Sequence, residues 1–271
     1  MTKRYELSEA QWERIEGLLP GKRQDPGRTA EDNRRFVHGV LWVLRSGDHW
    51  HDRPERYDRW KSVHQRFTRW ARAGVWEKVF ASLVKDASND YVMLELTLVK
   101  AQQQAATGKG RAPRIRLLGR SRGGLTTKIH LLADTLGRPL RLLLRPGQAA
   151  NIKSAPAFLE NVRAKGVIAD KCYDSNALHD SITSLGMEVV IPSNRTRKII
   201  LPHDPVVYRT RNCIERCFNK LKHFRRIATR FDRRDCHFMA FLLSLALSYG
   251  CVECRFSLVL VKISGFVKKC F

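Results

Sequence analysis

Three carboxylates, Glu95, Asp170 and Glu215, are the residues of this 271-residue chain whose positions best suit metal-dependent chemistry. Glu95 lies inside an apolar, β-rich run, Asp170 directly follows the short apolar segment Val167–Ala169, and Glu215 falls in a helical pattern. Acids at the ends of neighbouring strands can converge with one from a packed helix. Such a cluster suits Mg²⁺, which takes a few carboxylates together with waters and substrate phosphate. Two ions held there would serve phosphodiester transfer.

Two of these acids also have a plainer structural explanation. Glu215 could pair with Arg211 one helical turn away, and Asp170 could cap a helix or close a turn. For either acid considered alone, the structural explanation is favoured over a catalytic role. Tyr208, Arg211, Glu215 and Lys222 are separated by three, four and seven residues, so on a helix they would share one face. That face would present a carboxylate beside cations able to hold a DNA phosphate.

The charge of the chain points to a polyanionic partner. Lys and Arg number 50 against 26 Asp and Glu, a formal net charge of +24, and such a field suits a phosphate backbone better than a small metabolite. A hydrophobic content of 43% allows real cores and excludes general disorder. No apolar run is long enough for a membrane span, and the N-terminus has no apolar leader. We therefore expect a cytoplasmic, nucleoid-associated protein with reduced cysteines and no membrane partner.

The composition changes after residue 76, because all six tryptophans lie within the first 76 residues. The polar stretch 85–90 is the expected boundary. This predicts a helical DNA-binding domain over 1–88, a catalytic domain over 89–250 and an atypical tail over 251–271.

Short amphipathic helices are predicted for the first domain. The expected signals are a capping box at Ser8–Gln11 flanked by Leu7 and Trp12, helix starts at Thr29 and near Ser62, and a helix end at Gly74. Arg66 and Arg69 fall largely off the apolar face of the third helix and are candidate DNA contacts. The pattern favours a helix-turn-helix-like DNA binder. A packing domain with solvated arginines is the alternative.

The sequence after residue 90 predicts an α/β domain with a mixed sheet. The expected strands are Tyr91–Leu98, Thr126–Asp134, Pro139–Arg145, Val167–Ala169 and Glu188–Pro192. The expected helices are Ala155–Ala164, Ser175–Leu185, Val206–Lys222 and Asp235–Tyr249. Arg120, Arg122 and Lys128 lie in a stretch that is rich in arginine and contains a single acid. We expect these three to follow a DNA backbone, although a solvated strand face is the alternative.

Several stretches together resemble bacterial insertion-sequence transposases of the DDE type, in the insertion-sequence-five family. Tyr208, Arg211, Glu215 and Lys222 match the family's Y-R-E-K signature spacing for spacing. The other matching stretches are ERCFNKLKHFRRIATRFDR, GRSRGGLTTKIH, VIADKCYDS and VIPSNRTRK, with YELSEAQWERIEGLLPGKRQDPGRT and LRSGDHWHDRPERYDRWKSVHQRFTRWARAGVW nearer the N-terminus. The resemblance extends to about residue 250, and residues 251–271 resemble no part of the family.

The resemblance implies a ribonuclease-H-like catalytic domain preceded by the small all-α domain. It implies a transposase that binds the terminal inverted repeats of its element and performs metal-dependent cleavage and strand transfer. Glu95, Asp170 and Glu215 would be the catalytic ligands of two Mg²⁺ ions, with Mn²⁺ as a substitute. Tyr208, Arg211 and Lys222 match the remaining signature residues, expected to contact DNA. The partners would be double-stranded repeat and target DNA, with a homo-oligomer in the synaptic complex.

The sequence departs from the family at the first catalytic position. Relatives read roughly D-S-T-x-V-x-A-H-Q-H, whereas this chain reads E-L-T-L-V-K-A-Q-Q-Q from Glu95. Glu95 keeps the charge but adds a methylene, and a misplacement of that size can cost on the order of 10²-fold in rate. Ala150–Asn151 also replaces a typical His-Asp pair. The rival interpretations are an inactive copy that only binds element ends and a nucleic-acid binder without sequence preference.

Overall fold

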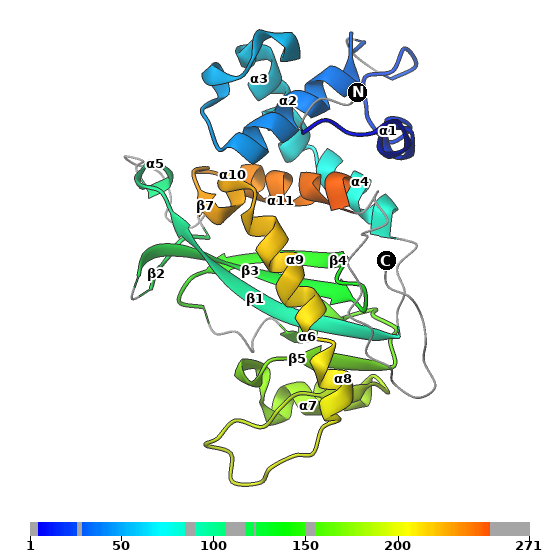
Figure 1. Ribbon diagram of the computed structural model, residues 1–271, viewed down its shortest axis with the longest axis vertical. Coiled ribbons are helices and arrows are strands. Elements are labelled where there is room, and N and C mark those ends of the chain that lie inside the picture. The colour runs from blue at the N-terminus through cyan, green and yellow to red at the C-terminus, as the bar shows by residue number, and fades with distance from the viewer. Residues whose placement is uncertain are drawn as a thin grey trace.

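The computed structural model describes residues 5–25, 29–84, 90–106, 117–121, 123–149 and 155–249, and Figure 1 shows their arrangement. The N-terminal helices are α1 (Glu9–Glu16), α2 (Asn33–Ser46), α3 (Trp60–Arg72) and α4 (Val75–Val84), with short 3₁₀ turns η1 (Trp50–Asp52) and η2 (Glu55–Tyr57). A mixed sheet with its own helices follows. The predicted fold class, an α/β domain preceded by a small helical region, is confirmed. No described helix is both long and apolar enough to cross a membrane.

The capping box of α1 is present as predicted. The Ser8 hydroxyl accepts the backbone N–H of Gln11, and the Gln11 side chain accepts the backbone N–H of Ser8 at 2.8 Å. Leu7 and Trp12 are both buried in the same hydrophobic cluster. This local chemistry fixes where α1 begins and which face it buries.

The boundaries of the next two helices differ by a few residues from the prediction. Helix α2 begins four residues after Thr29, because the Asp32 carboxylate caps it by accepting the backbone N–H of Arg35 at 2.8 Å. Helix α3 begins two residues before Ser62. Gly74 follows the end of α3 in a left-handed conformation, as predicted.

The sheet contains every predicted strand. Its strands are β1 (Tyr91–Ala101), β2 (Gly119–Ser121), β3 (Gly124–Asp134), β4 (Pro139–Pro146), β5 (Gly166–Ala169), β6 (Glu188–Val190) and β7 (Thr229–Arg230). Strands β4, β3 and β1 are antiparallel neighbours, and β5 and β6 continue the sheet parallel to β1. The short strands β2 and β7 pair with β3 and β1. Strands β2 and β7, of three and two residues, were not predicted.

Two predicted helices are wrong in extent. The helices after β1 are α5 (Gln103–Ala106), α6 (Ala155–Leu159), α7 (Asn176–Ser184), α8 (Pro205–Arg209), α9 (Asn212–Lys222), α10 (Arg225–Ala228) and α11 (Asp235–Tyr249). Helix α6 does not reach Ala164, because Asn161 adopts a left-handed φ of 58°. The single helix expected over 206–222 is divided into α8 and α9. Backbone N–H groups of Thr210, Arg211 and Cys213 bond three residues back, which tightens the turn between them.

The sheet separates two layers of helices. Val92 and Leu94 of β1 face the cluster that includes α6 and α7, whereas Met93 between them faces α9 and α11. Helix α11 lies between the N-terminal helices and the sheet (Figure 1). The rings of Phe67 in α3 and Phe241 in α11 are 4.5 Å apart. One hydrophobic cluster therefore runs from the N-terminal helices into the sheet, and the proposed division at residue 88 stays a prediction.

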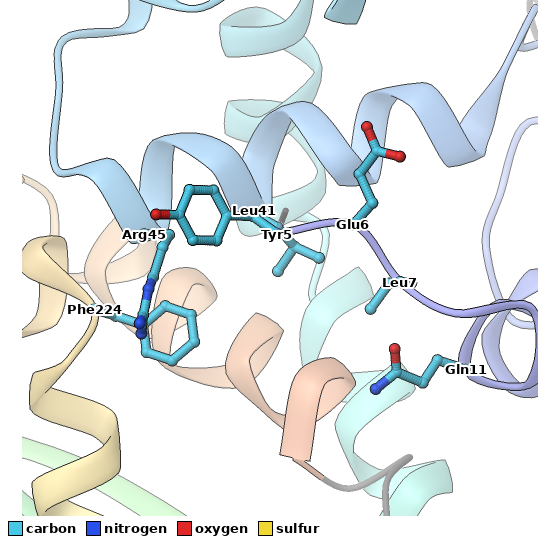
Figure 2. A pocket seen from close by; sticks show the side chains of 7 residues that line it. All are labelled: Tyr5, Glu6, Leu7, Gln11, Leu41, Arg45 and Phe224. Atoms are coloured by element: carbon cyan, nitrogen blue, oxygen red, sulfur yellow. The ribbon is translucent and has the colours of Figure 1, made fainter. Parts of the chain in front are cut away.

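A pocket lies between the N-terminal segment, α2 and the turn that follows α9 (Figure 2). It is lined by Tyr5, Glu6, Leu7, Gln11, Leu41, Arg45 and Phe224. The Arg45 guanidinium carbon lies 5.7 Å from the ring centre of Tyr5 and 4.8 Å from that of Phe224. This stacking links α2 to the N-terminal segment and to the turn that follows α9.

Gly47 allows α2 to pack against α10, and we expect its replacement to separate them. Gly47 ends α2 at a φ of 77°, and an added Cβ would lie 2.7 Å from the Cβ of Arg225. Gly47→Ala should therefore lower the free energy of unfolding by about 2–3 kcal/mol in urea denaturation. Gly17→Ala is the matched control, because Gly17 ends α1 with an ordinary φ and no atom within 4 Å of the added Cβ. An equal loss in both variants would contradict the packing argument.

Candidate active site

The parallel pairing of β1 with β5 brings two of the predicted acids together. Leu94 of β1 pairs with Ala169 of β5 as the last pair of their register. Glu95 directly follows Leu94, and Asp170 directly follows Ala169. The two acids therefore lie side by side where the pairing ends. Glu95 shares the face of Met93, which is the face covered by α9.

Arg211 connects the third acid to the first. It lies at the start of α9, which packs across β1 (Figure 1). One guanidinium nitrogen, Nη1, donates to Oε1 of Glu215 at 2.7 Å, and Nη2 lies 2.9 Å from Oε2 of Glu95. The side chain of Glu95 is 11% exposed and that of Arg211 is 16% exposed, whereas Glu215 is 51% exposed. The plain Arg211–Glu215 pair is therefore present, but the same guanidinium also reaches the sheet.

The charges of these groups act on one another. Burial raises the pKa of Glu95, the backbone N–H of Leu96 and the charge of Arg211 lower it, and the charges of Asp170 and Glu215 raise it further. Burial lowers the pKa of Arg211, but the surrounding acids, Glu95 foremost, outweigh burial and raise it. Arg211 thus stays charged and offsets the cost of gathering acids at a partly buried position.

Asp170 also has the structural role that was weighed against catalysis. Its Oδ1 accepts the backbone N–H of the next residue at 2.8 Å and so begins the 3₁₀ turn η5 (Lys171–Tyr173). Cys172 in that turn was not predicted as part of the site. Burial, followed by the charges of Asp170 and Glu95, raises the pKa of its thiol to about 12. Cys172 is therefore a neutral thiol at physiological pH, a weak ligand and a weak nucleophile.

A buried hydrogen bond supports the turn after Asp170. The hydroxyl of Tyr173 lies 3.1 Å from Nδ1 of His130 on β3. Burial, followed by the charges of Lys128 and Arg145, lowers the pKa of His130 to about 4, so its ring is neutral. Burial raises the pKa of Tyr173, which keeps its hydroxyl protonated. Sequence reasoning did not identify this pair, because nothing in the spacing of residues 130 and 173 indicates contact.

The other predicted DNA contacts of the α/β domain differ in their surroundings. The Tyr208 ring centre lies 5.8 Å from the Arg211 guanidinium carbon, whereas Lys222 is exposed at the end of α9. Lys128 on β3 donates to the backbone oxygen of Ala149 at 2.5 Å. Arg120 is exposed on β2, and Arg122 lies outside the described residues.

Arg66 and Arg69 are on α3, which lies at the opposite end of the molecule from α8 (Figure 1). Arg69 is exposed. Arg66 instead donates to the Asn33 side chain, and its guanidinium carbon lies 4.4 Å from the ring centre of Phe36 and 4.7 Å from that of Trp70. The structure does not bring either arginine to the acids, and it gives Arg66 a packing role.

Carboxylate oxygens are suitable ligands for a divalent cation, but in this structure the carboxylates of Glu95 and Glu215 contact the guanidinium of Arg211. Among the residues that the structure describes, no three His, Cys, Asp or Glu side chains gather closely enough to hold a metal. Oε2 of Glu95 is buried and has no hydrogen-bond donor, although it contacts Arg211 electrostatically. Carboxylate oxygens are the ligands that Mg²⁺ prefers. By donor type the carboxylates fit Mg²⁺, but in this structure the Arg211 guanidinium, not a cation site, lies between Glu95 and Glu215.

Comparison with protein families assigns both parts of the chain. Residues 7–80 match the family described as "Putative transposase of IS4/5 family (DUF4096)", and residues 96–250 match the family "Transposase DDE domain". The protein named "Putative transposase for insertion sequence element IS6501" of Brucella ovis is 38% identical over 120 residues, which are 44% of this chain and 92% of that protein. An uncharacterized protein of Sinorhizobium fredii, y4sN, is 38% identical over 112 residues, or 40% of this chain and 90% of that protein.

Solved structures give weaker matches. The Mos1 transposase paired-end complex with left transposon end is 13% identical, with a TM-score of 0.27 over 84% of this chain and 81% of that chain. The Mos1 mariner paired end complex with Mn is 12% identical, with a TM-score of 0.25 over 90% of this chain and 85% of that chain. TM-scores this low support no conclusion about this chain.

We expect Arg211→Gln to destabilise the protein in a pH-dependent way. Removing the guanidinium leaves Glu95 ionised without its partner, which should cost about 2–4 kcal/mol at neutral pH. The pKa of Glu95 in the folded state would then rise further. Stability should fall as the pH rises from the ordinary glutamate pKa, about 4.3, through this raised value, so the deficit should shrink in acid. Urea denaturation across this range measures it.

Two further variants make this measurement decisive. Arg211→Gln combined with Glu95→Gln should recover most of the loss, because no buried carboxylate remains. Arg216→Gln is the matched control on the same helix, where the guanidinium Nε donates to Asn212 at 3.2 Å, and we expect a change within about 0.5 kcal/mol. A deficit that is the same at every pH would argue against the role of Glu95.

Proposed function

The chain belongs to the DDE transposase family, and from this premise we propose that it binds the terminal inverted repeats of an insertion sequence and catalyses metal-dependent DNA cleavage and strand transfer. The observation that carries this proposal is the contact of Glu95 and Glu215 with one guanidinium, together with Asp170 directly after the neighbouring strand β5. A surface of solvated acids would not need a shared, largely buried cation.

In this proposal Glu95, Asp170 and Glu215 hold two Mg²⁺ ions, or Mn²⁺ in their place. When bound, the two ions supply Lewis acidity to the attacking water or 3′-hydroxyl and to the leaving oxygen. Glu95 supplies a buried carboxylate oxygen that has no hydrogen-bond donor, Asp170 its carboxylate at the end of β5, and Glu215 one that is half-exposed on α9. The second oxygen of Glu95 is fixed by the backbone N–H of Leu96 at 3.0 Å.

Arg211 and its neighbours would hold the DNA phosphate. Arg211 neutralises Glu95 and Glu215, and if it left these carboxylates its guanidinium could bind a phosphate with two N–H groups. Burial, opposed by the charge of Arg211, raises the pKa of Tyr208, so its hydroxyl stays protonated and can donate. Lys222, exposed two turns after Glu215, would add a further cation on the path of the strand.

The remaining contacts with DNA would be more distant. We propose that Arg120 and Lys128 follow the backbone along β2 and β3, as does Arg122. Arg69 would contact the terminal repeat from α3, and Arg66 would mainly orient that helix through its stacking. Because element ends must be brought together and joined to target DNA, two or more copies would act in one synaptic complex.

An inactive copy that only occupies element ends is the second candidate. The specific observation in its favour is Glu95, which stands where the family pattern has Asp. The longer side chain reaches the Arg211 guanidinium at 2.9 Å. A shorter carboxylate would withdraw from that contact, so the extra methylene both shifts the ligand and strengthens the competing ion pair.

We expect Glu95→Asp to raise cleavage of a duplex that carries the terminal repeat flanking this gene. The shorter carboxylate restores the family geometry and loosens the pair with Arg211, so nicking should increase by up to about 10²-fold. Mn²⁺, which tolerates looser geometry, should partly rescue the natural protein. A gel assay of wild type and variant with each metal gives both rates.

Asp170→Ala is the negative control in the same assay, and it should abolish nicking while DNA affinity stays the same or tightens slightly. A wild type as active as Glu95→Asp would mean that Glu95 is a competent ligand. A Glu95→Asp variant as inactive as Asp170→Ala would favour the inactive copy.

DNA affinity should fall steeply with salt, because cations on several elements would displace counterions. The slope of log K against log salt becomes more negative by about 0.9 for each phosphate of B-DNA that the protein neutralises. Lys222→Ala should reduce the slope by about 1 and weaken binding to all sequences alike. Lys78→Ala, which removes an exposed cation of α4, is the matched control and should leave the slope unchanged. Fluorescence anisotropy at several salt concentrations measures the affinity and its salt slope for each variant. An affinity that does not depend on salt would contradict DNA binding.

A further inference from the structure

Two adjacent isoleucines project from the loop between β6 and α8, residues 191–204. The side chains of Ile199 and Ile200 are 75% and 77% exposed, and no other large apolar residue in the described part of the chain exceeds 49%. Single exposed apolar residues are ordinary. Two neighbours this exposed, in a chain that buries its cores well, indicate a surface that meets a partner.

The loop is held in shape although its tip is exposed. At its neck the hydroxyl of Ser193 accepts the backbone N–H of Leu201 at 2.9 Å and donates to its carbonyl at 3.3 Å. Arg197 donates from Nε to the carbonyl of Ile199 at 3.0 Å and from Nη1 to Asp174, whose carboxylate is 1% exposed. Arg197 is thus a positioning residue that fixes the backbone of the isoleucine pair before any partner binds.

Both ends of the loop connect to the candidate active site. Asp174, which holds Arg197, follows Asp170 by four residues through η5. At the other end the ring centre of His203 lies 5.5 Å from that of Tyr208 in α8, which leads directly to Arg211. In Figure 1 the loop extends beyond α7, at the end of the molecule opposite the N-terminal helices.

The charge around the pair indicates what it meets. Arg195 and Lys198 are exposed on either side of Arg197, so the isoleucines sit within a short positively charged segment. Duplex DNA offers the complementary chemistry, an anionic backbone around an apolar stack of bases. A second copy of this chain would bring two such segments of like charge together.

We propose that Ile199 and Ile200 insert between bases of the DNA held at the candidate active site and unstack a base step near the phosphate to be cut. Apolar side chains inserted in this way kink a duplex and are compensated by the contacts that the bend permits. Here the wedge would separate the strands beside Asp170 and Arg211, which would let one strand enter the site. This inference rests on the proposed function.

The test uses the full chain and a fluorescein-labelled duplex of the terminal repeat with its flanking DNA. The adenine analogue 2-aminopurine, which brightens when unstacked, replaces one adenine at a time near the cleavage point. Wild type should brighten the probe at one step. Ile199→Ser with Ile200→Ser should abolish that signal and lower affinity by about 10-fold, with an unchanged salt slope because no charge is lost. Ile199→Leu with Ile200→Leu should retain signal and affinity.

Leu185→Ser is the matched control, because Leu185 is 49% exposed at the end of α7 and outside the loop. It should keep signal and affinity. A serine loop variant that does the same would overturn the proposal. So would loss of a sedimenting dimer in that variant with the fluorescence signal intact, which would assign the isoleucines to a second copy. Failure of wild type to bind the duplex would refute the proposed function itself, an outcome distinct from both.

Discussion

The parallel register between β1 and β5 is the constraint on which the candidate site depends. It sets Glu95 and Asp170 at the same level of one sheet, and the face of Glu95 follows from the alternation of β1. A slip of one residue would turn Glu95 toward α6 and α7 and leave α9 facing an apolar residue. The packing of α9 on β1 then decides whether Arg211 can reach both Glu95 on the sheet and Glu215 on its own helix. Everything electrostatic at this site follows from those two placements.

The sequence was sufficient for the parts of the fold that repeat a pattern. Alternation and apolar runs predicted β1, β3, β4, β5 and β6, and acids from neighbouring strands were expected to converge with one from a packed helix. The contact between Arg211 and Glu95 could not be predicted, because it depends on how α9 crosses the sheet. Left-handed Asn161, which shortens α6, likewise leaves no periodic signal. The catalytic roles of the acids remain predictions.

The net charge overstates what DNA could meet, because several arginines serve the interior. Arg230 is fully buried and donates to Thr127 and Asp235. Arg226 pairs with Asp232, and its guanidinium carbon lies 5.3 Å from the ring centre of Phe241. Arg66 shows why position on a helix misleads here, since a long side chain that starts off the apolar face can lie back across it. Composition predicts the class of partner but not which cations would contact it.

Helix α11 has a consequence for how the chain acquires its structure. It is apolar on all sides and fills the space between α3, α4 and the sheet, yet it is made long after the helices that it joins. Synthesis at about 5–20 residues per second would leave those helices without this partner for on the order of ten seconds. During that interval their apolar faces are open to chaperones and to aggregation. The core can therefore be completed only in the last part of translation. A ribosome that stalls before α11 would release a chain that cannot complete its hydrophobic core.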